Sequence, residues 1–568
     1  MAVGARHRSE WAVLVIAALV WLPALDGRDL WSPDEPRIAQ VAEELRAGYA
    51  GPTGAVLLHL DGQPYSQKPP LYYWLAAALG TPFGHVGEWA ARLPSALGGL
   101  ASLALTMALA RRLFGAAYAP WAGGLLLSCH RFSELAQRAQ LDLLLTACEL
   151  AALLAWLRAE RGELDHKRAF ALLHAALGAG MLVKGPVALL PLAAIAVHSV
   201  LERRASELRA LFAPRGLALS LGPFLVWGGA ALALAPPGFF HDAVILNLGT
   251  RFTSGTSHIR PFYFYAYRLP LDFLPGALLL PWAAVSAWRA CRGAAPQQRS
   301  WRLLSVWVLV FVGFFSLSAG KRGLYLLPTF PLLAIACAAT LVDALRGRSR
   351  LPRGSGWGLA AASGALAISG ALALAGGPLL VEVPETLELP DAFFAAVVVI
   401  CSAALAAGAL VAGHAQAALV RAGIALASVV GLQASVFQLL YPALDPERSL
   451  RPVAEAAAAL ARPGEKIGVV HHMSLIPGLT YYAGGEPGRF ENLTDHAAIQ
   501  EFLATGRGQV LISETRRDWA LEPAPHPRRH QFRSADRRIW VLAPRGRRER
   551  LGTPPPGAQT DTQLPVGA

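Results

Sequence analysis

Long apolar runs, separated by charged loops, make up most of this chain. A helix that crosses the hydrocarbon core of a bilayer needs about 20 mainly apolar residues, and runs near that length recur as far as residue 440. The pattern therefore predicts an all-α polytopic membrane protein with about 13 transmembrane helices. The expected spans lie near residues 11–25, 93–110, 115–130, 139–157, 169–183, 185–201, 216–235, 271–289, 303–319, 323–343, 357–376, 391–412 and 419–440.

The basic residues between these runs predict an orientation. Arginines recur in alternate loops, and such loops face the cytoplasm in membrane proteins. The basic loops are Arg111-Arg112, 158–168, 203–215, 289–302 and 346–353. The acidic first loop, residues 26–92, the aromatic loop 236–270 and everything after Tyr441 are then expected outside the cytoplasm.

The chain changes character after the last apolar run. Residues 465–470, 509–513 and 537–544 have the pattern of short strands, and 452–461 and 495–506 that of helices. We expect a transmembrane domain over residues 1–440, a small extracytoplasmic α/β domain over 441–545, and a disordered tail over 546–568.

Composition agrees with this class. The chain is 54% hydrophobic and 16% charged, and its mean hydropathy is +0.39. The net charge of +13 sits mostly in short loops, where it sets orientation and gives no reason to expect nucleic-acid binding. Five cysteines form no C-x-x-C pair, so the sequence indicates neither a disulfide framework nor a zinc-thiolate site.

Charged residues at the ends of apolar runs are the candidate chemistry. Asp34 and Glu35 lie in the first loop, Asp142 opens an apolar run, and Lys68, Lys184 and Lys321 are three of only five lysines. Each lysine alone could simply extend its ammonium to the membrane surface. Together, cations and carboxylates at one surface suit phosphate chemistry. Without a Gly-rich phosphate loop before Lys-Ser/Thr, a lipid-linked phosphate is the expected substrate, not a nucleotide.

The loop 236–270 adds further candidates. Asn247, Arg251 and His258 supply hydrogen-bond donors, and the tyrosines that follow are typical of an interfacial aromatic belt. His258 could bind metal or phosphate, or only cap the loop.

Several motifs in this order resemble bacterial membrane glycosyltransferases of the GT-C fold. They are WSPDEPR, G-Q-P-Y-x-x-KPPLYYW, E-W-A-A-R-L-P-S-A, R-A-Q-L-D, V-K-G-P, N-x-x-x-R-F with the following H and P-F-Y-F-Y, and K-R-x-x-Y-L-L-P. The resemblance covers residues 10–345 and is to the aminoarabinose lipid A transferases and the protein O-mannosyltransferase-like enzymes.

The resemblance implies a role for each matching residue. Asp34 is expected to be the base or to orient the acceptor, with Glu35 beside it and Asp142 as the second acidic position. The implied contacts to the donor phosphate are Lys68, Lys184, Lys321, Arg322, Arg251 and Tyr325. The candidates for substrate binding are Arg37, Tyr65, Asn247 and His258.

One position departs from the relatives. Aminoarabinose transferases often have Glu before the lysine of the KPP motif, whereas this chain has Gln67, a poorer ligand for a divalent ion. The cofactor is therefore open, with a divalent metal as one option and Asp34, Asp142 and His258 as candidate ligands.

The function expected from these features is sugar transfer from a polyprenyl-phosphate donor to a lipid, glycan or protein acceptor, with inversion. The enzyme would lie in the bacterial cytoplasmic (inner) membrane, act on its outer face in the cell envelope, and bind no nucleic acid. The alternative is a flippase or transporter for lipid-linked sugars, in which the same charges line a path.

Overall fold

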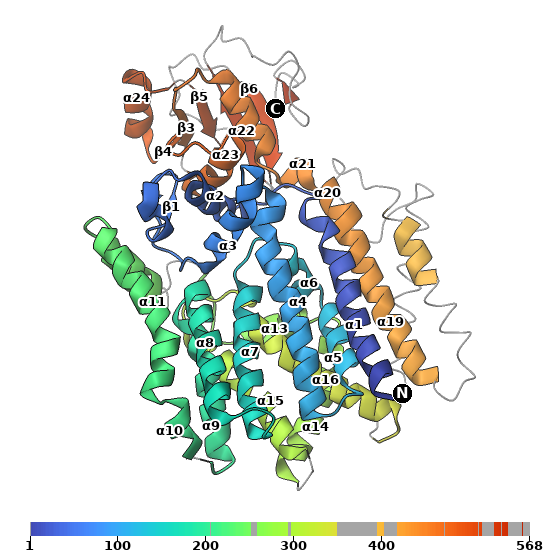
Figure 1. Cartoon of the computed structure of the whole chain (residues 1–568). Helices are drawn as coiled ribbons and strands as arrows, with labels where there is room; N and C mark the ends of the chain where they lie inside the picture. Colours follow the sequence, from blue (N-terminus) through green and yellow to red (C-terminus); the bar gives the residue numbers. More distant parts are fainter. Residues whose placement is uncertain are drawn as a thin grey trace. The chain divides into compact units, whose positions relative to one another are not determined.

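Helices dominate the first part of the chain in the computed structural model (Figure 1). The structure describes residues 2–204, 206–250, 258–293, 297–348, 393, 395–402, 417–470, 472–508, 510–513, 528–534, 537–543 and 559–560. Contacts along the chain divide it into two compact units. The first unit comprises residues 1–25, 66–72 and 92–440, and the second comprises 26–65, 73–91 and 441–568.

The first unit is built from helices. Its longer α-helices are α1 (Ala2–Trp21), α4 (Glu88–Leu113, whose first turn belongs to the second unit), α7 (Asp142–Glu160), α8 (His166–Lys184), α11 (Pro214–Leu234), α15 (Gln298–Leu317), α16 (Phe330–Leu345) and α19 (Ala417–Ser435). Shorter helices connect them, namely η1 (Pro23–Leu25), α5 (Ala119–Leu127), α6 (His130–Ala136), η4 (Pro186–Leu189), α9 (Leu190–Leu201), α10 (Ser206–Leu211), η5 (His241–Thr250), α13 (Phe264–Asp272), η6 (Gly276–Leu279), α14 (Leu280–Arg292), η7 (Gly323–Thr329) and η8 (Val436–Leu440).

Six helices in the described part of the chain are long and apolar enough to cross a membrane, or seven if α13 and the bent helix after it form one span. The expected thirteen spans are not reached there. Helix α5 has 9 residues and α9 has 12. Charged residues at the ends of α7 and α8 also make these two helices less apolar. The predicted spans 357–376 and 391–412 lie wholly or largely outside the described residues.

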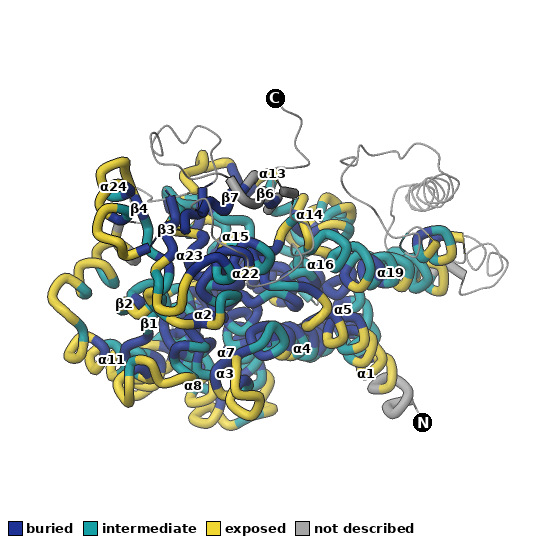
Figure 2. Tube along the Cα trace, turned by 90° about the horizontal axis from the view of Figure 1, so that it is seen from above, coloured by how far each residue is buried: buried dark blue, intermediate teal, exposed yellow. Residues whose placement is uncertain are grey.

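Burial separates inner from outer helices in this unit. In the apolar helix over Gly323–Leu345, 83% of the most apolar window is buried, whereas the share is 11% for Ser206–Leu234. Figure 2 accordingly shows α11 largely exposed. An apolar helix that remains exposed in the folded chain suits contact with lipid.

Helices α7, α8 and α11 pack in series, with α8 in contact with both of the others. At Gly178 of α8, a Cβ atom would lie 2.5 Å from the carbonyl oxygen of Leu219 on α11. Only glycine allows the two backbones to approach so closely. Helix α8 ends at Lys184, because Gly185 has φ 78° and Pro186 follows.

The second unit combines most of the first loop with the segment after Tyr441. The loop contributes α2 (Asp34–Ala47), η2 (Gly51–Ala55), the strand pair β1 (His59–Leu60) and β2 (Gln63–Pro64), most of α3 (Leu71–Gly80) and η3 (Thr81–Phe83). The later segment contributes the helices α20 (Tyr441–Ala443), α21 (Asp445–Arg448), α22 (Arg451–Leu460), η9 (Met473–Leu475), α23 (Ile476–Tyr482) and α24 (His496–Ala504). Helix α2 packs against α23, a grouping that the sequence analysis did not anticipate.

A six-stranded sheet forms the core of the second unit. Its strands are β3 (Ile467–Val470), β4 (Phe490–Leu493), β5 (Val510–Ser513), β6 (Arg528–Ser534), β7 (Arg537–Leu542) and β8 (Gln559–Thr560). The strand order is β4-β3-β5-β7-β6-β8, with β4, β3 and β5 parallel and the others antiparallel. Strands β3, β5 and β7 and helices α22 and α24 coincide with predicted elements. Most of the predicted disordered tail lies outside the described residues, although β8 falls within it.

Both faces of this sheet are covered. Ile467 and Val469 of β3 join a buried cluster with α22 and α23, whereas Val470 joins a second cluster with Phe502 of α24. Side chains alternate between the faces of a strand, so a strand covered on both faces is apolar throughout. The continuous run Ile467–Val470 therefore reflects burial on both faces.

Candidate functional site

Two of the candidate site residues in the first unit form an ion pair where α7 begins and α8 ends. Asp142 is the first residue of α7 and Lys184 is the last of α8. Their Oδ1 and Nζ atoms are 2.5 Å apart, and the side chains are only 5% and 11% exposed. The Lys184 ammonium also lies 5.0 Å from the centre of the Tyr325 ring. Three candidate residues that are far apart in the sequence thus lie close together, while their roles stay a prediction.

The pairing leaves Lys184 able to bind an anion. A lysine ammonium has three N–H donors, and Asp142 accepts from one of them. Burial strengthens the attraction between the ammonium and any anion that reaches it, because water no longer screens the charge. Asp142 and the Tyr325 ring in turn stabilise the ammonium in this position.

Glu149 is a charged residue of this region that the sequence analysis missed. It lies two turns after Asp142 on α7, so both carboxyl groups occupy one face of the helix. Glu149 is 1% exposed, and its Oε2 atom has no hydrogen-bond partner in the described part of the chain. A carboxyl group in the middle of an apolar run, here TACELAALL, was the signal that could have identified it.

Lys321 is placed differently from Lys184. It is 4% exposed, and its ammonium donates hydrogen bonds to the carbonyl oxygens of Arg260, at 3.1 Å, and Ser318. Its backbone N–H donates to the carbonyl of His258, at 3.0 Å. These bonds connect the segment before η7 to residues 258–260. They give Lys321 a structural role, and the phosphate contact that the resemblance implied stays a prediction.

The other candidates of this unit are less informative. The carbonyl oxygen of Arg322 accepts a hydrogen bond from Tyr265, and Lys68 is half-buried and directly precedes Pro69 and Pro70, after which α3 begins. His258 is exposed and has a positive φ of 56°. Arg251 and the side chain of Asn247 lie outside the described residues.

The adjacent carboxylates of the first loop have different surroundings. Glu35 is 1% exposed and pairs with Arg28 at 2.7 Å, and it also accepts a hydrogen bond from the backbone of Trp31. Asp34 opens α2, and its side chain is 22% exposed, with Arg37 at 3.8 Å. Of the two, Asp34 is therefore the one accessible to a substrate, whereas Glu35 stabilises the loop.

Tyr65 is buried within the second unit. It is 7% exposed and accepts a hydrogen bond from Tyr73, with 3.3 Å between the hydroxyl oxygens. The two rings meet edge to face with their centres 5.8 Å apart. This packing supports the loop, and the role of Tyr65 in substrate binding stays a prediction.

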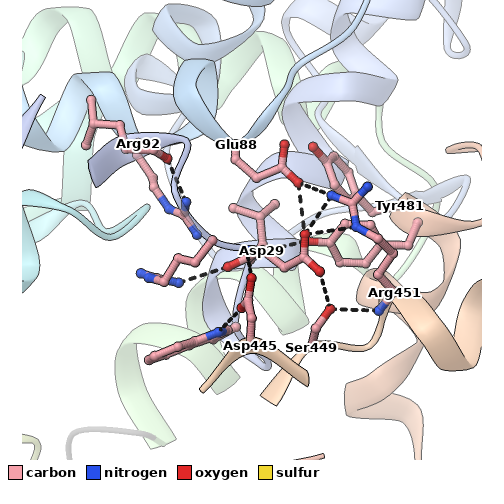
Figure 3. Close-up of polar contacts among 12 residues, drawn as sticks. Asp29, Glu88, Arg92, Asp445, Ser449, Arg451 and Tyr481 are labelled. Carbon is pink, nitrogen blue, oxygen red and sulfur yellow. Dashed lines mark hydrogen bonds and ion pairs between the residues drawn. The ribbon is translucent and has the colours of Figure 1, made fainter. Parts of the chain in front are cut away.

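A polar network of the second unit joins the start of the first loop to the later segment (Figure 3). Arg451 pairs with Asp29 at 2.7 Å and with Glu88 at 2.6 Å. Ser449 donates to Asp29 at 2.6 Å, and the backbone N–H of Asp29 donates to Asp445 at 2.6 Å. Residues more than 400 positions apart in sequence are thereby connected, and the sequence pattern gave no sign of this network.

Burial shifts the titration of several groups in this unit. It raises the pKa of Asp445, although hydrogen bonds from the Asp29 backbone and the Trp31 indole oppose the shift. It also raises the pKa of the Tyr482 hydroxyl, which accepts a hydrogen bond from the backbone of Leu30 at 2.6 Å. Among the described residues, no group of three or more His, Cys, Asp or Glu side chains is arranged to hold a metal ion.

Known proteins match both the sequence and the fold. Residues 67–227 match the family model for dolichyl-phosphate-mannose-protein mannosyltransferase. An undecaprenyl phosphate-alpha-4-amino-4-deoxy-L-arabinose arabinosyl transferase of Aeromonas salmonicida is 31% identical over 61% of this chain and 63% of its own length. The protein of the same name from Pseudomonas aeruginosa is 32% identical over 62% and 63%. The aligned region thus spans less than two thirds of these relatives.

Solved structures extend the likeness in fold to most of the chain. The crystal structure of ArnT from Cupriavidus metallidurans bound to undecaprenyl phosphate has a TM-score of 0.71 and 22% identity, and the match covers 94% of this chain and 97% of that one. An archaeal oligosaccharyltransferase from Archaeoglobus fulgidus has a TM-score of 0.51 and 13% identity, with 94% and 74% covered.

These matches define the class of the protein as a membrane protein of the GT-C fold. Within that class, they confirm the resemblance to the aminoarabinose transferases and the protein O-mannosyltransferase-like enzymes.

Proposed function

We propose that this chain is a membrane glycosyltransferase that moves a sugar from a polyprenyl-phosphate donor to a lipid, glycan or protein acceptor. The observation that carries the proposal is the ammonium of Lys184, a side chain only 11% exposed, which Asp142 and Tyr325 hold where α7 begins and α8 ends. Both residues of the ion pair lie in the segment that matches the mannosyltransferase model. A buried cation at the end of membrane helices is suited to the phosphate of a membrane-bound donor.

The reaction is a single displacement at the anomeric carbon. An acceptor hydroxyl attacks from the side opposite the lipid phosphate and forms the new glycosidic bond with inversion. The bond between the anomeric carbon and the phosphate oxygen breaks, and its electron pair leaves with the polyprenyl phosphate. Asp34 receives the hydroxyl proton, and the ammonium groups of Lys184 and Lys68 stabilise the charge on the leaving phosphate.

The membrane arrangement belongs to the same proposal. We place about 13 spans in the bacterial inner membrane, the first loop and the α/β segment outside the cytoplasm, and the reaction on that outer face. The arginine-rich loops support this orientation. The names of the relatives suggest an undecaprenyl-linked aminopentose as the first donor to try, while Gln67 makes the metal requirement a separate question.

The test is release of free polyprenyl phosphate by purified protein in nanodiscs, with a panel of polyprenyl-phosphate sugars and acceptors, with and without EDTA. We expect release that Asp34→Asn and Lys68→Ala abolish. Near-normal transfer by a well-folded Asp34→Asn variant would refute its role as base. Tight donor binding without release, for every donor and acceptor, would favour the flippase alternative.

A further inference from the structure

A cavity of about 140 Å³ lies in the first unit, at the ends of α7 and α9 and the start of α15. It is at the opposite end of α7 from Asp142, so it is distinct from the site described above. Three carboxylates line it, from Glu160, Glu202 and Glu207, together with three guanidinium groups, from Arg161, Arg204 and Arg299. The lining therefore carries both charges in equal number.

His198 indicates that the cavity is built for a ligand. This residue is 5% exposed, and its Nδ1 atom has no hydrogen-bond partner within the described residues. Its ring meets Trp156, another lining residue, edge to face at 5.7 Å. A buried ring nitrogen without a partner is costly, and a ligand that donates a hydrogen bond to it removes the cost.

The carboxylates are held at the cavity by arginines. Glu202 pairs with Arg299 at 3.1 Å and with Arg302 at 3.0 Å. Arg204 pairs with both Glu160 and Glu207. Arg161 differs from these arginines, because it is exposed and makes no carboxylate ion pair in the part of the chain that the structure describes. It is thus the lining cation best placed to meet an anionic group of a ligand.

The helix ends at the cavity contribute partial charges of both signs. The carbonyl ends of α7 and α9 favour a cation, whereas the N–H end of α15 favours an anion. Three apolar side chains, Leu113, Leu157 and Leu303, also line the cavity. This apolar surface suits the apolar part of a membrane lipid.

We propose that this cavity binds the headgroup of a zwitterionic phospholipid that carries a primary ammonium, of the phosphoethanolamine type. The ammonium donates two of its three N–H groups to glutamate carboxylates and the third to Nδ1 of His198, in the tautomer with hydrogen on Nε2. The phosphodiester binds Arg161, and the glycerol end of the lipid contacts the apolar lining residues. A choline headgroup has no N–H donor and is excluded from these hydrogen bonds.

The test is native mass spectrometry of the full-length protein with equimolar phosphatidylethanolamine, phosphatidylcholine and phosphatidylglycerol of identical acyl chains. The wild type is expected to retain phosphatidylethanolamine at least about fivefold over either competitor, since charge-assisted hydrogen bonds separate the headgroups. Arg161→Gln and His198→Phe should each remove most of this preference. Arg209→Gln, at an exposed arginine of α10 that does not line the cavity, should keep it.

Arg161 is exposed, so its substitution tests binding without threatening the fold. Equal retention of the ethanolamine and choline lipids by the wild type would overturn the proposal. An unchanged preference in both Arg161→Gln and His198→Phe would overturn it as well, as would a preference for phosphatidylglycerol, which would indicate a simple anion site. These measurements of lipid retention do not depend on whether the protein transfers sugar.

Discussion

Arg451 is the residue whose loss should most clearly loosen the second unit. Its guanidinium bonds Asp29 and Glu88, and it lies 4.6 Å from the centre of the Tyr482 ring. Arg451→Met keeps much of the apolar stem and removes these contacts. Charge-assisted hydrogen bonds contribute roughly 1.5–3 kcal/mol when buried. The Arg451 side chain is 43% exposed, so solvent screening reduces the expected loss to about 1–2 kcal/mol.

Hydrogen exchange of the full-length protein in nanodiscs measures this loss locally. The backbone N–H groups of Asp29 and Leu30 donate to Asp445 and Tyr482, so they report opening of the network. A loss of about 1–2 kcal/mol speeds their exchange roughly 5- to 30-fold. The control is Arg462→Met, at an exposed arginine for which the structure records no ion pair. Exchange at residues 29 and 30 that is equally slow in both variants would refute the role of the network.

Three further predictions concern the carboxyl groups of Glu44, Asp445 and Asp142. Glu44→Gln should lower the free energy of unfolding by about 1–3 kcal/mol, because the Glu44 carboxylate accepts hydrogen bonds from the backbone N–H groups of Asp61, at 2.5 Å, and Gly62, at 3.0 Å. The amide NH2 of glutamine would face one of these N–H donors and could not accept from it. Hydrogen exchange of residues 59–64 measures the loss. Burial raises the pKa of Asp445, so the folded state binds the proton of this carboxyl group more readily than the unfolded chain does. The resulting stabilisation is present below about pH 4 and is lost as the pH rises through the raised pKa. Asp445→Asn should therefore flatten the pH dependence of the unfolding midpoint in this range. Asp142→Leu should lower the melting temperature more than the double variant Asp142→Leu/Lys184→Met does. Removing one partner of a buried ion pair costs about 3–5 kcal/mol, whereas replacing both partners by apolar residues costs little. A double variant that is no more stable than the single variant would contradict this prediction.

Local features of the structure followed well from the sequence. The end of α8 is encoded by Lys-Gly-Pro, since glycine takes the positive φ and proline cannot continue the helix. The strands β3 and β5 were recognisable as short apolar runs between turn residues. Asp142, Lys184 and Tyr325 were singled out from motifs, and the structure brings them together.

Features that depend on contacts between distant parts of the chain could not be predicted from the sequence. Asp29 and Arg451 are 422 residues apart, and no local pattern specifies which charges meet across such a distance. Glu35 and Asp34 are neighbours with the same chemistry, but only the folded loop decides that Glu35 meets Arg28. Likewise, the sequence marks Lys321 as unusual without showing that its ammonium bonds two backbone carbonyls.

The measurement that tests the central claim most directly compares two lysines of the same helix. Single-turnover sugar transfer from a polyprenyl-phosphate donor is followed in Lys184→Met and in Lys167→Met, which changes an exposed lysine in the first turn of α8. Lys167→Met is expected to transfer sugar at the wild-type rate, while Lys184→Met is expected to lose roughly 100-fold or more, as when a single group that stabilises transition-state charge is removed. Equal rates in the two folded variants would contradict the claim that Lys184 stabilises the departing lipid phosphate.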